Sequence, residues 1–438
     1  MTIAHDALET RNPAERALLI AVDWHDDGWD LQSSLEELAH LAETADLNVV
    51  GSATQRLPHP HPGHYVGSGK LDEIKQLRET LEYDVVLVND ELSPSQLRHL
   101  EDAVGVKVID RTALILDIFA RRAQTHEGRL QVELAQLEYR LPRLTRMWTH
   151  LSRQAVGGVG LRGPGETQLE VDRRQARRRI SLIKEQLGEV HRHRQLYRER
   201  RRRQNLPVVA LVGYTNAGKS TLLNALSGSS VLVEDKLFAT LDPTTRRVTL
   251  PSGRAVLITD TVGFINNLPT LLVAAFRATL EEVLEASLLV HVMDVAHPRA
   301  AEQASTVQRV LEDLGADNRR TITVMNKIDR LPDGATADEA REAHGIPRDG
   351  VPVSARTGAG LDHLLQRVDD ALAAETRLVE VQVVVPYAQT GLVDLFRRRG
   401  QVASEGYTET GTLLAGRLPV DLLPRFAPFR QALPSGSA

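Results

Sequence analysis

A phosphate-binding loop is the sequence feature that most constrains this fold. Gly213, Gly218, Lys219 and Ser220 complete a GxxxxGKS pattern that follows the β-rich run PVVALVG and precedes a helical pattern. In that context glycines let backbone N–H groups surround phosphates, while Lys219 supplies a cation and Ser220 a magnesium ligand. A glycine turn that only caps a helix is the alternative, but chance rarely produces this pattern. We expect nucleotide contacts from Gly213, Tyr214, Thr215, Asn216, Ala217, Gly218, Lys219, Ser220 and Thr221.

A second motif ends the β-rich run AVLITD, where Asp260-Thr261-Val262-Gly263 forms a DxxG sequence. An acid in this place can hold magnesium through water, and a glycine amide can sense a γ-phosphate. We therefore expect Asp260 and Gly263 to form switch II.

Two further motifs point to guanine. Asn326-Lys327-Ile328-Asp329 ends the run RTITVMN, and the Asp329 carboxylate can accept two hydrogen bonds from guanine that adenine does not offer. Ser354-Ala355 ends VPVSA and looks like the element whose backbone reaches guanine O6. Each motif lies at the carboxyl edge of a predicted strand, so together they predict one ligand crevice in a doubly wound sheet.

Composition narrows the class of protein. At 438 residues the chain is long enough for roughly three domains. Its hydrophobic content of 42% is ordinary for a folded protein, and the absence of cysteine excludes disulfides, thiolate metal sites and iron–sulfur clusters. The first residues lack an apolar core, and no stretch approaches the roughly 18 apolar residues of a membrane span. We expect a soluble, cytoplasmic monomer without a membrane span.

Residues 17–123 alternate short β-rich runs with helical patterns, which is typical of βαβ units around a parallel sheet. Ser34 and Glu37 have the spacing of a capping box, and Ser93-Pro94 supplies an N-cap and a first-turn proline. An α/β domain is therefore expected here.

A basic helical hairpin is predicted next. Leu130, Leu134 and further apolar residues as far as Trp148 and Leu151 recur at three- and four-residue steps, and the same steps return from Ile180. Residues 173–203 carry 13 Lys and Arg against three acids, a net charge of +10 that leaves −15 elsewhere. Such asymmetry favours contact with a polyanion such as RNA, and a solvated helix that only packs domains is the alternative.

We thus predict an α/β fold in four units. They are an N-terminal parallel α/β domain at 17–125, an antiparallel helical hairpin with a glycine-rich tip at 126–204, a P-loop domain at 205–375, and a small α+β domain at 376–438.

The motifs in residues 207–375 resemble those of translation-factor-type GTPases. That resemblance implies GTP as the nucleotide and Mg²⁺ held by Ser220, Asp260 and a switch I hydroxyl. By likeness to GTPases with an FxTLxP sequence, Thr240 is the expected hydroxyl and Thr244 the alternative. Lys219, Thr240 and Gly263 are then the expected catalytic residues.

Phe264 bears on the rate of hydrolysis, and Asn216 bears on the binding of K⁺. Phe264 stands where many such GTPases carry a glutamine or histidine that orients water, so slow intrinsic hydrolysis is expected. It is either a buried anchor or a gate that moves when a partner binds. Asn216 matches the P-loop asparagine that some relatives use in binding K⁺, and a purely structural hydrogen bond is the alternative.

Three segments together resemble the HflX family of ribosome-associated GTPases. They are 65–70 (YVGSGK), 157–168 (GGVGLRGPGETQ) and 260–264 (DTVGF), and the likeness spans about residues 17–430. It implies binding to the large ribosomal subunit and its RNA, with the hairpin tip near the peptidyl-transferase centre, and separation of stalled ribosomes. A GTP-gated ribosome assembly factor is the alternative.

The resemblance also implies ATP binding by the N-terminal domain. Lys70 in the GSGK sequence is the candidate phosphate ligand. Because that tetrapeptide is short and common, we favour a helix-capping role for it.

Overall fold

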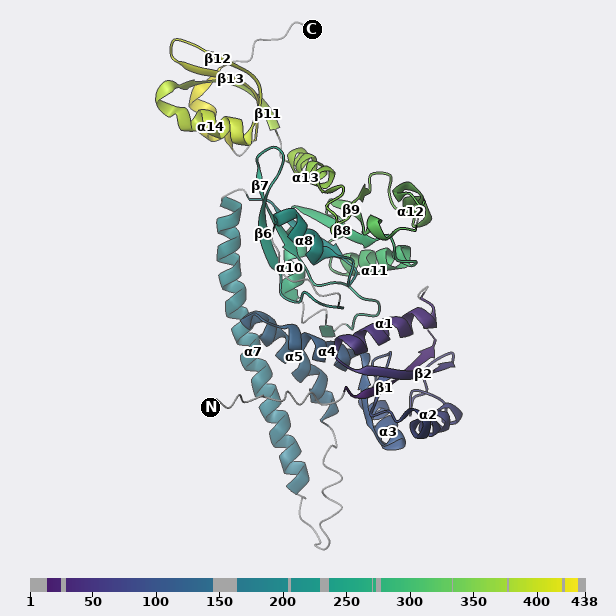
Figure 1. The fold of residues 1–438 in the computed structure, drawn as a ribbon. Coiled ribbons are helices and arrows are strands. Elements are labelled where there is room, and N and C mark those ends of the chain that lie inside the picture. Colours follow the sequence, from purple (N-terminus) through teal and green to yellow (C-terminus); the bar gives the residue numbers. More distant parts are fainter. Residues whose placement is uncertain are drawn as a thin grey trace, which may run out of the picture.

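The computed structural model describes residues 14–24, 29–144, 164–203, 206–228, 236–269, 271–272, 277–332, 334–375, 378–419 and 422–431. Three separate sheets organise these residues (Figure 1). The expected fold class is confirmed: a P-loop GTPase sheet lies between an N-terminal α/β region and a small C-terminal antiparallel domain.

The N-terminal sheet is wholly parallel, with strand order β2-β1-β3-β4. Its central strands are continuous apolar runs because helices cover both faces. The strands are β1 (Arg16–Asp23), β2 (Asn48–Arg56), β3 (Val85–Val88) and β4 (Lys107–Asp110), and the helices are α1 (Leu31–Thr44), α2 (Ser68–Leu81), α3 (Pro94–Val104) and α4 (Arg111–Arg122).

One helix start differs from the sequence prediction. Ser93 and Gln96 form a capping box at α3, next to the expected first-turn proline. At α1, however, Asp30 is the N-cap and accepts from the Ser33 N–H at 2.7 Å. The predicted Ser34–Glu37 box is wrong because Glu37 lies inside the helix on its buried face.

The hairpin consists of α5 (His126–Arg143) and the 40-residue α7 (Pro164–Arg203), which run antiparallel along one side of the molecule (Figure 1). Ile183 of α7 is fully buried. Ion pairs join the two helices at Arg179–Glu133 (2.6 Å), Lys184–Glu138 (2.8 Å) and Arg194–Glu127 (2.7 Å). Part of the basic charge of α7 therefore fastens the hairpin itself.

The predicted tip is shorter than expected, because α7 begins at Pro164 and so includes residues 164–168 of the glycine-rich stretch. Proline suits a first helical position because its missing N–H would have no helical partner there. Helix α5 ends at Arg143, and Trp148, Leu151 and residues 157–163 lie outside the described residues.

The GTPase sheet has strand order β10-β9-β8-β5-β7-β6, and only β6 runs antiparallel to its neighbour. Its strands are β5 (Val208–Gly213), β6 (Thr244–Thr249), β7 (Ala255–Asp260), β8 (Leu288–Asp294), β9 (Thr321–Asn326) and β10 (Val351–Pro352). Its helices are α8 (Lys219–Ser227), α10 (Arg277–Glu285), α11 (Ala300–Asp313), η1 (Ile328–Arg330), α12 (Ala337–Ala343) and α13 (Leu361–Glu375).

A four-stranded sheet of order β12-β13-β11-β14 forms the C-terminal domain, beyond α13 (Figure 1). Phe396 and Phe426 pack edge to face in its core at 5.6 Å between ring centroids. Its elements are β11 (Leu378–Pro386), η2 (Tyr387–Gln389), α14 (Thr390–Arg399), β12 (Gln401–Tyr407), β13 (Gly411–Pro419), α15 (Leu423–Phe426), η4 (Ala427–Phe429) and β14 (Arg430–Gln431). Among the described residues, no helix is long and apolar enough to cross a membrane.

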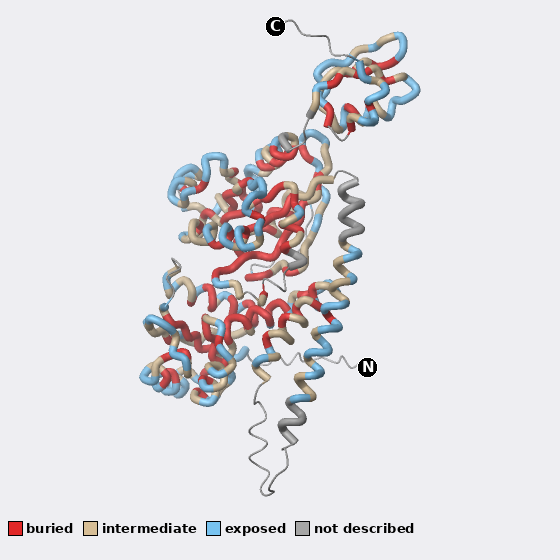
Figure 2. Tube along the Cα trace, turned by 180° about the vertical axis from the view of Figure 1, so that it is seen from behind, coloured by how far each residue is buried: buried red, intermediate tan, exposed pale blue. Residues whose placement is uncertain are grey.

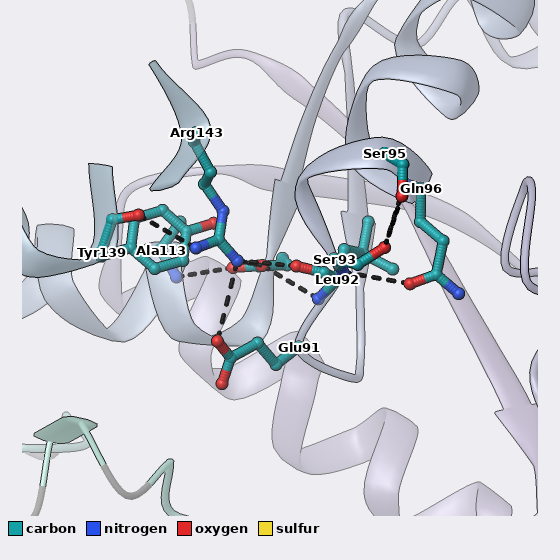
Figure 3. Close-up of polar contacts among 9 residues, drawn as sticks. Glu91, Leu92, Ser93, Ser95, Gln96, Ala113, Tyr139 and Arg143 are labelled. Carbon is teal, nitrogen blue, oxygen red and sulfur yellow. Dashed lines mark hydrogen bonds and ion pairs between the residues drawn. The ribbon is translucent and has the colours of Figure 1, made fainter. Parts of the chain in front are cut away.

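The far end of α5 is anchored to the N-terminal domain by a buried polar cluster. Figure 3 shows Arg143 and Tyr139 of α5 directed toward the loop of Leu92. Arg143 donates to the Leu92 carbonyl at 2.6 Å and lies 3.3 Å from Asp110, whose carboxylate also accepts from the Leu92 and Ala113 N–H groups. Asp110 is fully buried, and its burial raises the pKa of its carboxyl although Arg143 opposes that rise.

Replacing Arg143 should therefore destabilise the protein in a pH-dependent way. We expect Arg143→Met to lower the free energy of unfolding by about 3 kcal/mol at pH 8, because the Asp110 charge loses its buried partner. Losing Arg143 raises the pKa of Asp110 further, so the folded state takes up a proton more readily as the pH falls. The loss of unfolding free energy caused by Arg143→Met should therefore become smaller as the pH is lowered from 8 to 5, as measured by urea unfolding.

The exposed Arg140 on the same helix provides the control, since Arg140→Met should change stability little at either pH. An Arg143→Met penalty that is equal at both pH values would contradict the role given to the Asp110 charge.

Candidate nucleotide-binding site

The phosphate-binding loop connects β5 to α8, as the sequence predicts. Lys219 is buried in this loop, and its Nζ donates to the Gly213 carbonyl at 3.1 Å and to the Tyr214 carbonyl at 2.8 Å. Burial lowers the pKa of Lys219 to about 8, while the charge of Asp260 opposes this shift. Backbone carbonyls of the loop thus hold the Lys219 ammonium group in place.

Three oxygen-bearing side chains converge beside Lys219. The Ser220 hydroxyl lies 2.7 Å from the Thr240 hydroxyl and donates to Asp260 Oδ2 at 2.6 Å. Asp260 is 1% exposed, and its second oxygen, Oδ1, is buried with no hydrogen-bond partner in the described part of the chain. Thr240, and not Thr244 at the start of β6, is the hydroxyl that the structure bonds to Ser220. Hard oxygen donors of this kind fit Mg²⁺.

The NKxD residues meet the Ser354-Ala355 loop and the phosphate-binding loop. Asn326 donates to the Ala217 carbonyl at 2.8 Å and accepts from the Ala355 N–H at 3.1 Å, so it ties both loops together. The Ser354 hydroxyl donates to Asp329 Oδ1 at 2.6 Å and so orients the carboxylate expected to bind guanine.

Lys327, which follows Asn326, also contacts the phosphate-binding loop. It donates to the Asn216 carbonyl at 2.8 Å and forms an ion pair with Asp294 at 2.7 Å. Asn216 itself is exposed at a positive φ of 59°. The structure brings together all the predicted motifs at one edge of the sheet.

Switch II packs directly on the phosphate-binding loop. A Cβ on Gly263 would lie 2.7 Å from Thr215 Cα, so only glycine permits this approach. The next residue, Phe264, accepts from the Thr215 N–H at 2.7 Å and donates to the Gly213 carbonyl at 3.1 Å. Its side chain is 2% exposed, as the anchor interpretation requires.

The Tyr214 side chain has a role that the sequence did not reveal. Its backbone belongs to the phosphate-binding loop, but its hydroxyl donates to Glu37 of α1 and accepts from the Asn266 N–H at 2.9 Å. Arg111 of α4 pairs with Glu37 and donates to the Asn266 carbonyl at 2.9 Å. A buried polar network therefore joins the N-terminal domain to the phosphate-binding loop and switch II.

No sequence pattern could have found this network, because Glu37 and Tyr214 are 177 positions apart. The local sequence around Glu37 shows only the spacing of a capping box, which predicts a helix cap and not a contact between domains. Burial raises the pKa of Tyr214 well above its usual value, and the neighbouring Glu37 charge adds to that rise. The phenol therefore stays protonated and remains a donor.

Comparisons with known proteins match most of the chain. Three family models match it in succession: "GTP-binding GTPase N-terminal" at 32–120, "GTP-binding GTPase Middle Region" at 122–201 and "50S ribosome-binding GTPase" at 208–327.

Full-length relatives carry the name GTPase HflX. The protein of Caldanaerobacter subterraneus subsp. tengcongensis is 48% identical over 424 residues, which is 96% of this chain and 95% of that protein. The Escherichia coli K12 protein is 44% identical over 407 residues, 93% of this chain and 94% of its own length. A GTP-binding protein from Sulfolobus solfataricus, solved in complex with GDP, is 22% identical, covers 83% of this chain and 100% of its own, and has a TM-score of 0.43.

Base selection by Asp329 can be tested directly. We expect Asp329→Asn to weaken GTP binding about tenfold or more, because a charge-assisted hydrogen bond is worth about 1.5–3 kcal/mol. Xanthosine triphosphate should bind better to this variant, because its 2-oxo group accepts a hydrogen bond from the new amide. Calorimetric titration of the native protein and the variant with each nucleotide measures these changes in affinity.

Ser354→Ala is the matched control, since it removes only the hydroxyl that orients Asp329. It should weaken GTP binding less and give no gain for xanthosine triphosphate. If Asp329→Asn binds GTP as tightly as the native protein, Asp329 does not contact the base.

Proposed function

This chain belongs to the HflX family of GTPases, and on that premise we propose that it acts on the large ribosomal subunit to separate stalled or idle 70S ribosomes. The reaction is hydrolysis of GTP to GDP and phosphate, and the chain is a GTP hydrolase of that family. We further propose that it works in the cytoplasm, where its ribosomal target lies.

The division of charge along α7 is the observation that carries the ribosomal part of this proposal. Arg179, Lys184 and Arg194 pair with three acids, all of them on α5. Arg177 and Arg178, next to the first of these pairs, are exposed and form no ion pair with another described residue. Exposed and intermediate residues make up most of the described length of α7 (Figure 2). Exposed guanidinium groups on a long projecting helix suit RNA phosphates, and contacts of this kind make binding depend on salt.

Within the site we propose that Ser220, Thr240 and Asp260 hold Mg²⁺, directly or through water. The unpartnered Asp260 Oδ1 and the two converging hydroxyls support this assignment. When bound, Mg²⁺ neutralises charge on the β- and γ-phosphate oxygens. Lys219 would add a further positive charge, and we propose that the Gly263 N–H donates to the γ-phosphate.

The chain offers no side chain in residues 260–264 that can orient the attacking water. Phe264 is buried as an anchor between switch II and the phosphate-binding loop, which supports slow intrinsic hydrolysis. We propose that the large subunit orders switch II and so accelerates the reaction. A barrier lower by about 3 kcal/mol corresponds to a rate roughly a hundredfold higher.

For the N-terminal domain we favour the helix-capping interpretation over ATP binding. Gly67 is the N-cap of α2, and Lys70 in its first turn forms an ion pair with Glu73 at 2.7 Å. A lysine that is already paired within its own helix is a weak candidate for a phosphate ligand.

A splitting assay tests the proposal against the assembly-factor alternative. We expect purified 70S particles to separate into subunits in a sucrose gradient when the protein and GTP are present, and to remain intact with GDP. Replacing residues 157–163 by a Gly/Ser linker should abolish splitting but leave GTP affinity unchanged, since the nucleotide site lies in another domain.

Intact 70S particles together with GTP-dependent binding to free large subunits would favour the assembly factor. Persistent splitting by the linker variant would remove the tip from the mechanism.

The exposed arginines give a separate prediction about RNA contact. Arg177→Gln together with Arg178→Gln should weaken binding to large subunits and reduce the slope of log affinity against log salt by about 1–2, if each arginine meets a phosphate. Binding is measured by sedimentation at several salt concentrations.

Arg179→Gln together with Lys184→Gln removes the same charge from groups already paired with α5, so its slope should change little. Equal losses in the two double variants would show that total charge, and not the unpaired arginines, governs binding.

A further inference from the structure

Switch I, residues 236–243, connects two places that are far apart in sequence. At one side Thr240 lies in the candidate metal site, with its hydroxyl 2.7 Å from that of Ser220. Two residues later, the Asp242 carboxylate reaches the beginning of α5 in the hairpin. The same short segment therefore contacts both the nucleotide site and the hairpin.

Asp242 makes three hydrogen bonds at the start of α5. Its Oδ2 accepts from the backbone N–H groups of Gln124 at 2.8 Å and Thr125 at 2.9 Å, and its Oδ1 accepts from the Thr125 hydroxyl. Thr125 is itself the N-cap of α5, because its Oγ1 accepts from the Gly128 N–H at 2.9 Å. The carboxylate thus satisfies backbone donors just before the helix and fixes the capping hydroxyl.

The residue that faces this contact is glycine. A Cβ on Gly128 would lie 2.3 Å from Asp242 Oδ1, although glycine is otherwise unfavourable within a helix. The first turn of α5 is therefore shaped to admit the carboxylate of switch I.

Apolar contacts hold the rest of switch I against the same region. Phe238 packs edge to face on Phe119 of α4 at 4.7 Å between ring centroids, and Leu237 and Leu241 are buried. Together with Asp242, these side chains restrict the movement of Thr240 relative to α4 and α5.

Helix α5 can carry a displacement from one end to the other. Its 18 residues span about 27 Å, and its far end is held by the Arg143 cluster. A helix packed along its length moves as one body, because packed interiors do not deform continuously.

We propose that Asp242 is a positioning residue that links Thr240 in the metal site to the first helix of the hairpin. When Thr240 is held by the metal and the γ-phosphate, Asp242 is held at the start of α5. Loss of the γ-phosphate releases both. The effect on the ribosome rests on the proposed function, whereas the link to α5 does not.

Hydrogen exchange in the full-length protein tests the link without ribosomes. The Gln124 and Thr125 amides of the native protein should exchange about tenfold more slowly with Mg²⁺ and a non-hydrolysable GTP analogue than with GDP. Asp242→Asn removes the negative charge that these donors face and leaves only one acceptor oxygen, so it should abolish this nucleotide dependence. Gly128→Ala should do the same by displacing Asp242, even though alanine favours the helix.

The matched control is Asp46→Asn. Asp46 also contacts switch I, through Lys236 at 3.3 Å, but that ion pair is exposed and should contribute little. This variant should keep the native exchange pattern. Equal exchange with both nucleotides in the native protein, or a nucleotide dependence that survives in both Asp242→Asn and Gly128→Ala, would overturn the proposal.

Kinetics separate this proposal from the proposed function. With large subunits, Asp242→Asn should lower kcat for GTP by about tenfold while KM changes less than about threefold, as expected of a residue outside the nucleotide contacts. An unchanged kcat would count against Asp242. If large subunits fail to stimulate even the native protein, the ribosomal proposal fails, while the exchange result still decides the link to α5.

Discussion

The Arg111 guanidinium lies between two domains with only 3% of its surface exposed. It pairs with Glu37 and donates to the Asn89 side chain and to the Asn266 carbonyl, so its charge is satisfied on several sides. A buried ion pair of this kind adds little net stability but disfavours every arrangement that leaves one partner alone. The position of the N-terminal domain on the GTPase domain depends on this constraint.

Because the same network includes Tyr214 and Asn266, the phosphate-binding loop and switch II cannot change position without affecting the N-terminal domain. Around it, side chains from both domains form one continuous apolar core, in which Phe119 meets Phe238 and switch I is covered. Nucleotide binding, switch position and domain position are therefore coupled by direct contact.

The hairpin uses one kind of residue in two ways. Arg179, Lys184 and Arg194 pair with acids of α5, while the exposed Arg177 and Arg178 form no ion pair with another described residue. Composition alone leaves a solvated helix and an RNA-binding helix equally open, because it does not distinguish charges that are used within the fold from charges that are not. Only the packing of α5 against α7 makes that distinction.

The sequence by itself predicted most of the strands, and it indicated the chemistry of the P-loop, DxxG and NKxD motifs, because these depend on residues close together in the chain. It also implied their convergence, since parallel strands bring their carboxyl ends to one edge. The tertiary structure decided which threonine contacts Ser220. It also placed Glu37, the expected helix cap, in contact with Arg111 and with Tyr214 of the GTPase domain. Finally, it brought Asp242 into contact with Thr125, 117 positions away in the sequence. Such partners are chosen by how whole domains pack, and no local propensity or spacing encodes that choice.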